Sequence, residues 1–219
     1  MNKFWVKTNS LVRFIYPGYV WKISNEEKKV FLTFDDGPTP EVTEWVLETL
    51  QKYNAKATFF CIGKNIKSEP KIFRKIISGG HVVGNHTFNH LKGWRTNTKT
   101  YIENVKKCSE ICIEHSQDSD RSGFKRNNLF RPPYGKIKNS QAKGLKKLGY
   151  RIIMWDIISM DFDPKITNKE CLNNVINNIE EGSIIVFHDS FKAYEKLKAV
   201  LPETLEYLKE NNYSCATIC

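Results

Sequence analysis

Short apolar runs alternate with amphipathic stretches along the whole chain. Seven runs are typical of strands, at 30–34, 58–62, 82–85, 129–131, 152–156, 184–188 and 214–218. Segments with helical periodicity separate them, near 41–53, 69–78, 98–115, 140–148, 168–180 and 194–210. This alternation indicates a parallel sheet with helices outside it. The pattern therefore predicts an α/β fold of about seven parallel strands, arranged as a (β/α) barrel, with an open doubly wound sheet as the second interpretation.

Three helix boundaries carry chemical signals. Thr39 followed by Pro40 predicts an N-cap with proline in the first helical position. Thr167 and Glu170 have the spacing of a capping box before an apolar stripe. Pro202 should start or kink the last helix, because its ring disrupts a helix interior.

Polar residues cluster where the predicted strands end. The cluster Asp35-Asp36-Gly37 follows the first strand, and His86 and His90 follow the third. Further clusters end the later strands, with Arg131 to Tyr134 after the fourth, Asp161 beyond the fifth, and His188 with Asp189 at the sixth. Parallel α/β folds collect their functional residues at the carboxyl ends of the strands. We therefore expect these side chains to meet at one edge of the sheet.

Each cluster has a purely structural explanation when taken alone. Asp-Asp-Gly-Pro is a common turn sequence, and His-x-x-x-His places two rings on one face of a helix without any need for a ligand. Their joint placement at strand ends favours a metal site formed by Asp36, His86 and His90. Two imidazoles and one carboxylate suit zinc, with cobalt, nickel or manganese as alternatives, and leave positions open for water or substrate. Such a metal produces a nucleophile from water near neutral pH.

Three motifs in this order resemble those of the polysaccharide deacetylase family, which shares the NodB homology domain and is also called carbohydrate esterase family 4. They are Thr33-Phe34-Asp35-Asp36-Gly37-Pro38, the segment from Gly84 to His90, and Arg131-Pro132-Pro133-Tyr134-Gly135. The resemblance extends over residues 30 to 218. It implies a distorted (β/α) barrel and the removal of an N-acetyl group from an amino sugar in a glycan.

The resemblance also implies a role for each motif residue. Asp35 would be the general base, oriented by Arg131, and Asp36, His86 and His90 the metal ligands. His188 would be the general acid with Asp161 as its charge partner. The backbone N–H of Tyr134 would help to stabilise the oxyanion. Pro132, Phe162 and Val186 would wall the acyl pocket, although the family commonly has tryptophan at the position of Phe162 and leucine at that of Val186.

The composition adds little to this prediction. Hydrophobic residues make up 40% of the 219 residues and charged residues 26%, as in ordinary globular proteins. A net charge of +10 attracts acidic partners, but no nucleic-acid-binding motif accompanies it, so nucleic acid is not the expected partner. The six cysteines lack CxxC spacing and should be free thiols. Cys108, Cys112 and His115 could bind a second metal, but Tyr101 and Val105 continue their stripe, which favours a buried helix face.

The first 25 residues are basic and aromatic, and we expect them to form a strap packed against a catalytic domain at 26–219. Docking on a membrane through Phe4, Trp5, Phe14 and Tyr16 is the alternative. No segment reaches the ~18 apolar residues that span a bilayer, and no cleavable signal peptide is predicted. The default prediction is therefore a cytoplasmic protein, with membrane-surface or exported placement as alternatives.

Two other functions compete with deacetylation. Related enzymes act on formamido sugars or cyclic ureides, so the substrate could be another amide. A carbohydrate-binding protein without activity is the alternative from a different class. That alternative is weakened because Asp35, Asp36 and both histidines are all present.

Overall fold

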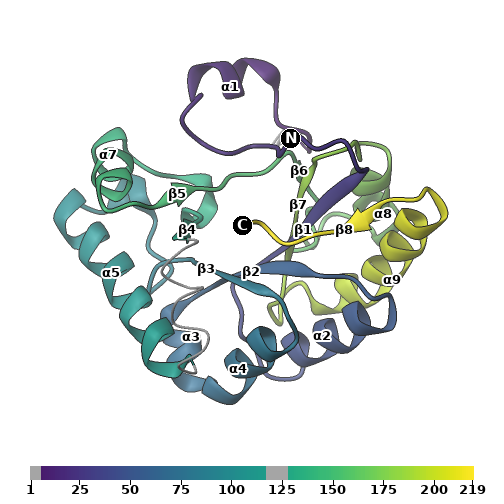
Figure 1. The fold of residues 1–219 in the computed structure, drawn as a ribbon, viewed down its shortest axis with the longest axis horizontal. Helices are drawn as coiled ribbons and strands as arrows, with labels where there is room; N and C mark the ends of the chain where they lie inside the picture. Colours follow the sequence, from purple (N-terminus) through teal and green to yellow (C-terminus); the bar gives the residue numbers. More distant parts are fainter. Residues whose placement is uncertain (1–5, 117–127) are drawn as a thin grey trace.

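The computed structural model describes residues 6–116 and 128–219, which form strands surrounded by helices (Figure 1). The strands are β1 Lys29–Asp35, β2 Ala57–Cys61, β3 Val82–Asn85, β4 Leu129–Phe130, β5 Arg151–Ile152, β6 Ile157–Ile158, β7 Ile184–His188 and β8 Ser214–Cys215. The helices are α1 Ser10–Ile15, α2 Val42–Lys52, α3 Gly63–Ser68, α4 Pro70–Ser78, α5 Thr98–His115, α7 Asn139–Lys147, α8 Asn168–Ile176 and α9 Tyr194–Glu210. Two short 3-10 helices are η1 Gly93–Arg95 and η2 Pro133–Gly135.

All strand pairs are parallel, in the order β5-β4-β3-β2-β1-β7-β6, with β8 added to β1. The α/β fold with a barrel-like parallel sheet is therefore confirmed, and the open doubly wound alternative is wrong. The strands β5 and β6 stand at opposite ends of this order, so the barrel is open between them. This opening is the distortion that the sequence resemblance implied.

The side chains of β1 alternate between two environments. Val30, Leu32 and Phe34 pack among the buried residues that also include those of α2 and α9. Phe31 belongs instead to a separate cluster with Phe60 and Ile218. Because successive side chains of a strand point to opposite faces, β1 supports both the helix layer and the barrel interior.

The predicted strand 152–156 is split in the structure. Its first part pairs with β4 as β5, and the chain then crosses the barrel opening before β6 pairs with β7. In the crossing, the N–H of Met154 donates to the carbonyl of Val20, and the N–H of Asp156 donates to that of Ile184. An apolar run shows that a segment is buried but not that it keeps one strand partner.

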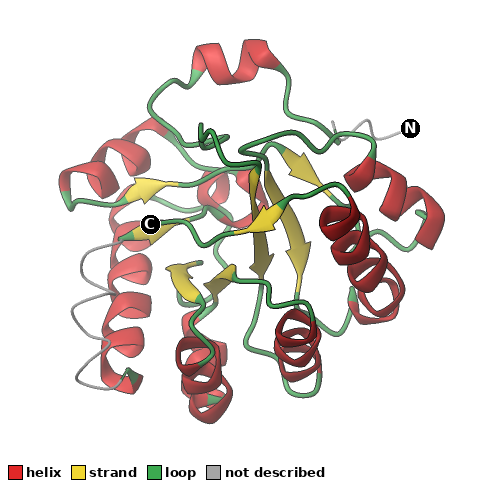
Figure 2. Cartoon of the chain, turned by 45° about the vertical axis from the view of Figure 1, so that its right-hand side comes forward, coloured by secondary structure: helices red, strands yellow, loops and turns green. Residues whose placement is uncertain are grey.

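The segment from Val6 to Asn25 lies across this opening (Figures 1 and 2). Lys7 forms an isolated antiparallel bridge with Ile157, and Val20 forms a parallel bridge with Ile153. The N–H of Thr8 donates to the carbonyl of Asp156 at 2.8 Å. The segment thus supplies backbone partners to both edges of the open barrel. Phe4 and Trp5 lie outside the described residues.

Several local predictions need correction. The side chain of Thr39 does not cap α2, since Glu41 occupies the N-cap position and makes no side-chain cap. The terminal strand is shorter than predicted, and α1 and α3 were not predicted. The helix α8 ends at Ile176, before the predicted limit of 180. The capping box of Thr167 and Glu170 is confirmed, and Pro202 lies inside α9 instead of starting it.

The cysteine predictions agree with the structure. All six cysteines are free thiols. Cys108 and Cys112 are fully buried together with Tyr101 and Val105 along α5. Among the described residues, the group that could hold a metal ion is elsewhere, at Asp36, His86 and His90. Across residues 6–116 and 128–219, each helix is too short or too polar to cross a bilayer.

Candidate active site

The strand register brings the predicted polar clusters to one edge of the barrel. Asp35, the last residue of β1, is the Cα partner of His188, the last residue of β7. Cys61 and Asn85 form the last pair of β2 and β3, so His86 begins the loop directly after β3. Parallel strands end at the same level, and the clusters therefore converge although they are far apart in the sequence.

Asp36, His86 and His90 form a group that fits a metal ion. The ligand atoms that the three side chains offer all lie within 4.8 Å of one another. Oδ1 of Asp36 is 3.1 Å from Nε2 of His90 and 3.7 Å from Nε2 of His86. This oxygen is buried and has no hydrogen-bond partner. A buried, unpaired carboxylate oxygen facing two imidazole nitrogens is the environment of a divalent cation.

Both histidines are held in the neutral form that binds metals. Burial, together with the neighbouring His90, lowers the pKa of His86 to about 3. Burial also lowers the pKa of His90. In neutral His86, Nδ1–H donates to the carbonyl of Arg131 at 2.8 Å, which leaves the lone pair of Nε2 available to a metal.

The segment that carries the two histidines is a loop, not a helix. The N–H of Thr87 donates to the side-chain oxygen of Asn85 at 2.8 Å. From α5, Oδ1 of Asn104 accepts hydrogen bonds from the N–H groups of Phe88 and Asn89, at 2.8 and 3.0 Å. Two asparagine side chains thus fix the loop, and the interpretation of His-x-x-x-His as one helix face is wrong.

Arg131 is fully buried and links several strand ends. Its Nη1 donates to Oδ1 of Asp35 and to the hydroxyl of Thr33, both at 2.7 Å. Its Nη2 donates to the carbonyl of Met154 at 2.9 Å. Burial lowers the pKa of this guanidinium, and Asp35 acts against that effect. A buried charge held by this many acceptors fixes the orientation of the Asp35 carboxylate.

His188 and Asp161 form the second charged pair of the site. Nδ1 of His188 lies 2.8 Å from Oδ1 of Asp161, and the backbone N–H of His188 donates to Oδ2 at 2.7 Å. Burial acts to lower the pKa of His188, but the charge and hydrogen bond of Asp161 outweigh it and raise the pKa to about 9. His188 is therefore protonated at neutral pH.

Tyr134 lies beside the candidate metal ligands. Its ring centroid is 4.6 Å from that of His90, and its side chain is exposed. The backbone of Tyr134 has a positive φ of 60°. Asp36, Thr87 and His90 also have positive φ, at 82°, 65° and 55°. Such backbone strain in non-glycine residues concentrates at functional sites, where surrounding contacts hold it.

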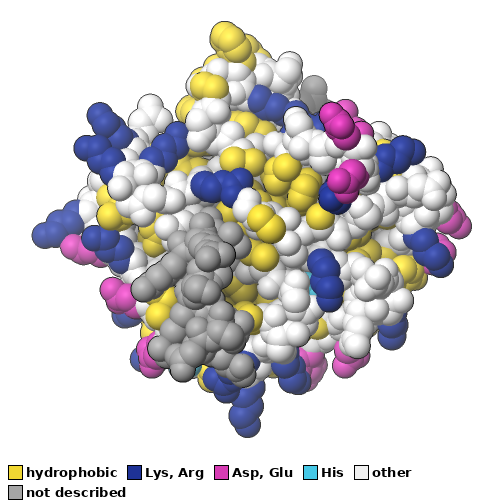
Figure 3. Space-filling view, in the orientation of Figure 1, with side chains coloured by type: hydrophobic (Ala, Val, Ile, Leu, Met, Phe, Trp, Pro, Cys, Tyr) yellow, Lys and Arg dark blue, Asp and Glu magenta, His cyan; other side chains and the backbone are white. Residues whose placement is uncertain are grey.

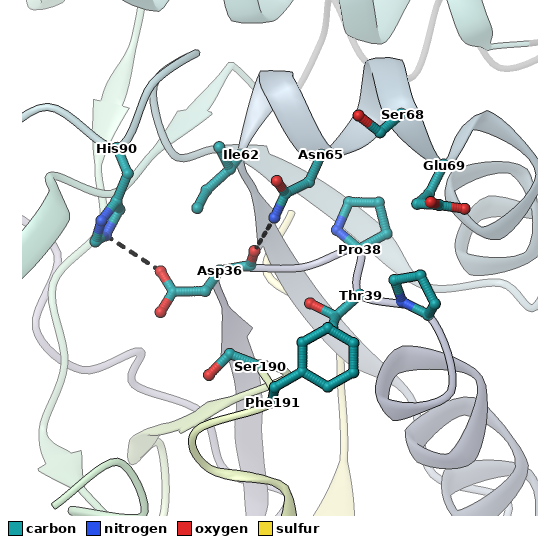
Figure 4. Close-up of a pocket in the computed structure, with 11 residues that line it drawn as sticks. Asp36, Pro38, Thr39, Ile62, Asn65, Ser68, Glu69, His90, Ser190 and Phe191 are labelled. Carbon is teal, nitrogen blue, oxygen red and sulfur yellow. Dashed lines mark hydrogen bonds and ion pairs between the residues drawn. The ribbon is translucent and has the colours of Figure 1, made fainter.

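A cavity of about 400 Å³ opens beside Asp36 and His90 (Figure 4). Its lining includes Asn65, whose Nδ2 donates to the backbone carbonyl of Asp36 at 2.7 Å. Ser190 and Phe191, which follow β7, line the cavity as well. The sequence analysis missed these three residues. The sequence could have indicated them, because all three lie shortly after the ends of β2 and β7, where functional residues of such folds collect.

The residues predicted for the acyl pocket are not part of this cavity. Pro132, Phe162 and Val186 do not line the cavity. Val186 is buried with Ile158 and Met160, and Phe162 packs against this cluster. The ring of Phe162 meets that of His188 edge-on, with centroids 4.9 Å apart. Val186 is therefore in this cluster and Phe162 packs against it, next to the His188–Asp161 pair.

Known proteins resemble this chain in sequence and in fold. The sequence profile of the polysaccharide deacetylase family matches residues 22–153. A peptidoglycan-N-acetylglucosamine deacetylase of Bacillus cereus is 33% identical over 209 residues, which cover 92% of each chain. A chitooligosaccharide deacetylase of Azorhizobium caulinodans is 35% identical over 78% of this chain and 79% of its own. The crystal structure of a peptidoglycan N-acetylglucosamine deacetylase bound to 4-naphthalen-1-yl-N-oxidanyl-benzamide superposes with a TM-score of 0.85, at 28% identity, and covers 96% of this chain and 95% of that one.

Proposed function

Because the chain belongs to the polysaccharide deacetylase family, we propose that it hydrolyses the N-acetyl group of an amino-sugar-containing glycan of the chitooligosaccharide or peptidoglycan type. The products are acetate and a free amine. One observation carries the proposal: the donor group of Asp36, His86 and His90 shares a strand edge with the ion pairs Asp35–Arg131 and His188–Asp161. This set contains a base, an acid and a metal site.

Asp36, His86 and His90 would hold the divalent metal, with zinc as the first choice and cobalt, nickel or manganese as alternatives. When bound, such an ion polarises the amide carbonyl and makes water more acidic. The two neutral histidines and the single carboxylate would leave a net positive charge at a site loaded with a divalent ion, where it would favour an amide oxygen that gains negative charge.

Asp35 is suited to accept the proton of the attacking water. The hydrogen bond from Arg131 at 2.7 Å keeps its carboxylate in one orientation. The water oxygen forms a bond to the acyl carbon while its proton moves to Asp35. The resulting oxyanion would be stabilised by the backbone N–H of Tyr134, a contribution of ~3–4 kcal/mol for one positioned donor.

His188 is suited to protonate the leaving amine. The C–N bond breaks as the oxyanion collapses, and the amine nitrogen needs a proton to leave. Asp161 raises the pKa of His188 to about 9 against the effect of burial, so the imidazolium is the prevailing form at neutral pH. Asp161 also holds the ring through Nδ1, which leaves Nε2 for the substrate.

The cavity beside Asp36 supports a glycan as the substrate. It opens next to the candidate metal ligands and carries the exposed ring of Phe191, and the exposed ring of Tyr134 lies over His90. Exposed aromatic faces next to a polar cleft offer apolar surface to sugar rings. The buried cluster at Phe162 and Val186 is the proposed place of the acyl methyl group.

The decisive experiment is acetate release from N-acetylated chitooligosaccharides and peptidoglycan fragments, before and after chelation. We expect release that is lost with chelator and restored by a divalent metal. Formate release from formamido sugars alone, or ureide hydrolysis alone, would replace the proposal with the amidase alternative. Binding of the same glycans without any release, with metal present, would favour a carbohydrate-binding protein.

A further inference from the structure

The short helix α1 turns its apolar side chains toward solvent. Leu11, Phe14 and Ile15 follow the i, i+3, i+4 spacing of one helix face, and their exposed fractions are 61%, 81% and 56%. Val12, by contrast, packs against a buried cluster. A surface helix ordinarily places its apolar stripe on the core, so α1 has the reverse arrangement on its outer side.

Specific contacts hold α1 in this position. The side-chain oxygen of Asn9 accepts a hydrogen bond from the N–H of Leu11 at 2.8 Å. At the other end, Nε1 of Trp21 donates to the carbonyl of Tyr16 at 3.1 Å. Between them, Arg13 forms an ion pair with the buried Asp156. The ion pair of Arg13 and the hydrogen bond from Trp21 attach α1 at two points, and the N-cap of Asn9 stabilises its first turn. The exposed apolar side chains are therefore held at the surface, as at a contact site.

The surface around α1 is basic. Neither residues 6–25 nor residues 128–155 contain an aspartate or a glutamate. A groove of about 570 Å³ between α1 and α7 is lined by Ile15 and Tyr16 on one side and by the exposed Lys143, Lys146 and Lys147 on the other. In Figure 3, hydrophobic side chains gather at the top, over α1, and lysine and arginine side chains lie on the side of α7.

Two acidic side chains form ion pairs with basic residues of the amino-terminal segment. Asp156 is paired with Arg13 and Lys7. Glu180 is paired with Lys7 and Lys22. Lys143 and Lys147 are exposed, and Nζ of the exposed Lys146 lies 5.0 Å from the centroid of the Tyr19 ring. The charges of these three lysines are therefore accessible at the surface.

Three occupants can be compared by their chemistry. In a symmetric dimer of this chain, the same lysines would face each other, which opposes association. An acidic polymer would satisfy the lysines but not the apolar side chains of α1. An anionic lipid bilayer satisfies both, because apolar side chains enter the interface while lysines contact the head groups.

We propose that α1 and α7 form a docking surface for an anionic lipid bilayer, with Leu11, Phe14 and Ile15 inserted at the interface and Lys143, Lys146 and Lys147 on the lipid phosphates. This surface would hold the protein at a membrane through side chains of α1 and α7. The proposal does not depend on the catalytic function, because none of these residues belongs to the candidate active site.

The test is co-sedimentation of the full chain with vesicles of phosphatidylcholine alone or mixed with phosphatidylglycerol. We expect binding to the mixed vesicles only, weakened by salt. The double variant Leu11→Ser/Phe14→Ser and the double variant Lys143→Glu/Lys147→Glu should each lower the affinity by roughly tenfold or more. The matched control Lys52→Glu/Lys71→Glu changes the same charge on exposed positions of α2 and α4 and should bind as the wild type does.

Circular dichroism and activity on a soluble substrate show that each variant is folded. Equal loss of binding in the control pair would reduce the effect to net charge and overturn the proposal. Unchanged vesicle binding of the Leu11/Phe14 variant would also overturn the proposal. The same holds if the protein does not bind vesicles but binds an acidic wall polymer through these lysines. Self-association in analytical ultracentrifugation that is lost in the Leu11/Phe14 variant, without vesicle binding, would assign the surface to a second copy of the chain.

Discussion

The buried carboxylate of Asp189 accepts a hydrogen bond from the backbone N–H of Gly37, with 3.0 Å between Oδ1 and the nitrogen. Its Oδ2 accepts a second one from the hydroxyl of Thr43 at 2.6 Å. A Cβ built on Gly37 would lie 1.9 Å from Oδ2, so only glycine leaves room for this carboxylate. Asp189 therefore holds the turn that follows the proposed metal ligand Asp36.

Replacing Asp189 should loosen that turn. In Asp189→Ala, the N–H of Gly37 and the hydroxyl of Thr43 lose a buried acceptor, which costs about 1–3 kcal/mol of unfolding free energy for each unsatisfied group. Metal affinity should fall about 10–100-fold, as for other residues that orient ligands. Denaturant unfolding and metal titration measure both effects. Asp189→Asn keeps an acceptor for Gly37 and should lose less, and equal losses in both variants would contradict the role of this hydrogen bond.

Removing a proposed metal ligand should abolish activity. Asp36→Ala and His90→Ala each leave two ligands, too few to hold the ion at a competent site. Metal content and acetate release should both fall to background in the purified, folded variants. His115→Ala changes a histidine of α5 outside the ligand group and serves as the control. Full activity of the wild type after thorough chelation would rule out the metal-dependent mechanism.

The activity should decline at alkaline pH as His188 loses its proton. Its pKa is raised to about 9, so the acid form is present below that pH and disappears above it. A cation bound beside Asp36 opposes part of this rise, so the alkaline limb of kcat/KM should lie at or below pH 9. Asp161→Asn removes the charge that does most to raise the pKa and should move the limb toward lower pH. If the alkaline limb of kcat/KM stays at the same pH in Asp161→Asn, His188 is not the group whose deprotonation lowers the activity.

His188→Ala supplies the matching rate measurement. Loss of a positioned acid should lower turnover by about 10²–10⁴-fold while metal binding is retained. Steady-state kinetics on an N-acetylated oligosaccharide, together with metal analysis, test this expectation. A wild-type rate with full metal content would remove His188 from the mechanism.

Acyl selectivity should depend on Phe162. This ring packs beside Val186 and meets His188 edge-on, and Phe162→Trp adds bulk at that position. A change of one methylene in an apolar pocket alters discrimination by about 1–3 kcal/mol, so acetyl should stay accepted while propionyl is disfavoured. The measurement is the ratio of kcat/KM for N-acetyl and N-propionyl forms of one oligosaccharide. An unchanged ratio would show that Phe162 does not line the acyl pocket.

Local patterns in the amino-acid sequence were sufficient to predict the class of fold and most of the candidate site. The alternation of apolar runs with helical periodicity placed the strands and outer helices, because these signals depend on local spacing. The clusters at Asp35, His86, Arg131 and His188 were recognisable because parallel strands end at a common edge. The group of Asp36, His86 and His90 follows from that rule, and the register of β1 with β7 agrees with it. The pairs Asp35–Arg131 and His188–Asp161 were implied by the family resemblance.

Which strands meet, and which residues surround the site, depends on contacts between elements that are distant in the sequence. The run at 152–156 leaves β4 and crosses the barrel opening because backbone groups of the amino-terminal segment pair with it, as the bond from Met154 to Val20 shows. The contacts of Asp189 with Gly37 and Thr43, and the cavity at Asn65 and Phe191, join residues from distant elements. Such long-range hydrogen bonds and packing leave no periodic trace in the sequence, since they depend on how the finished strands and loops are placed in space.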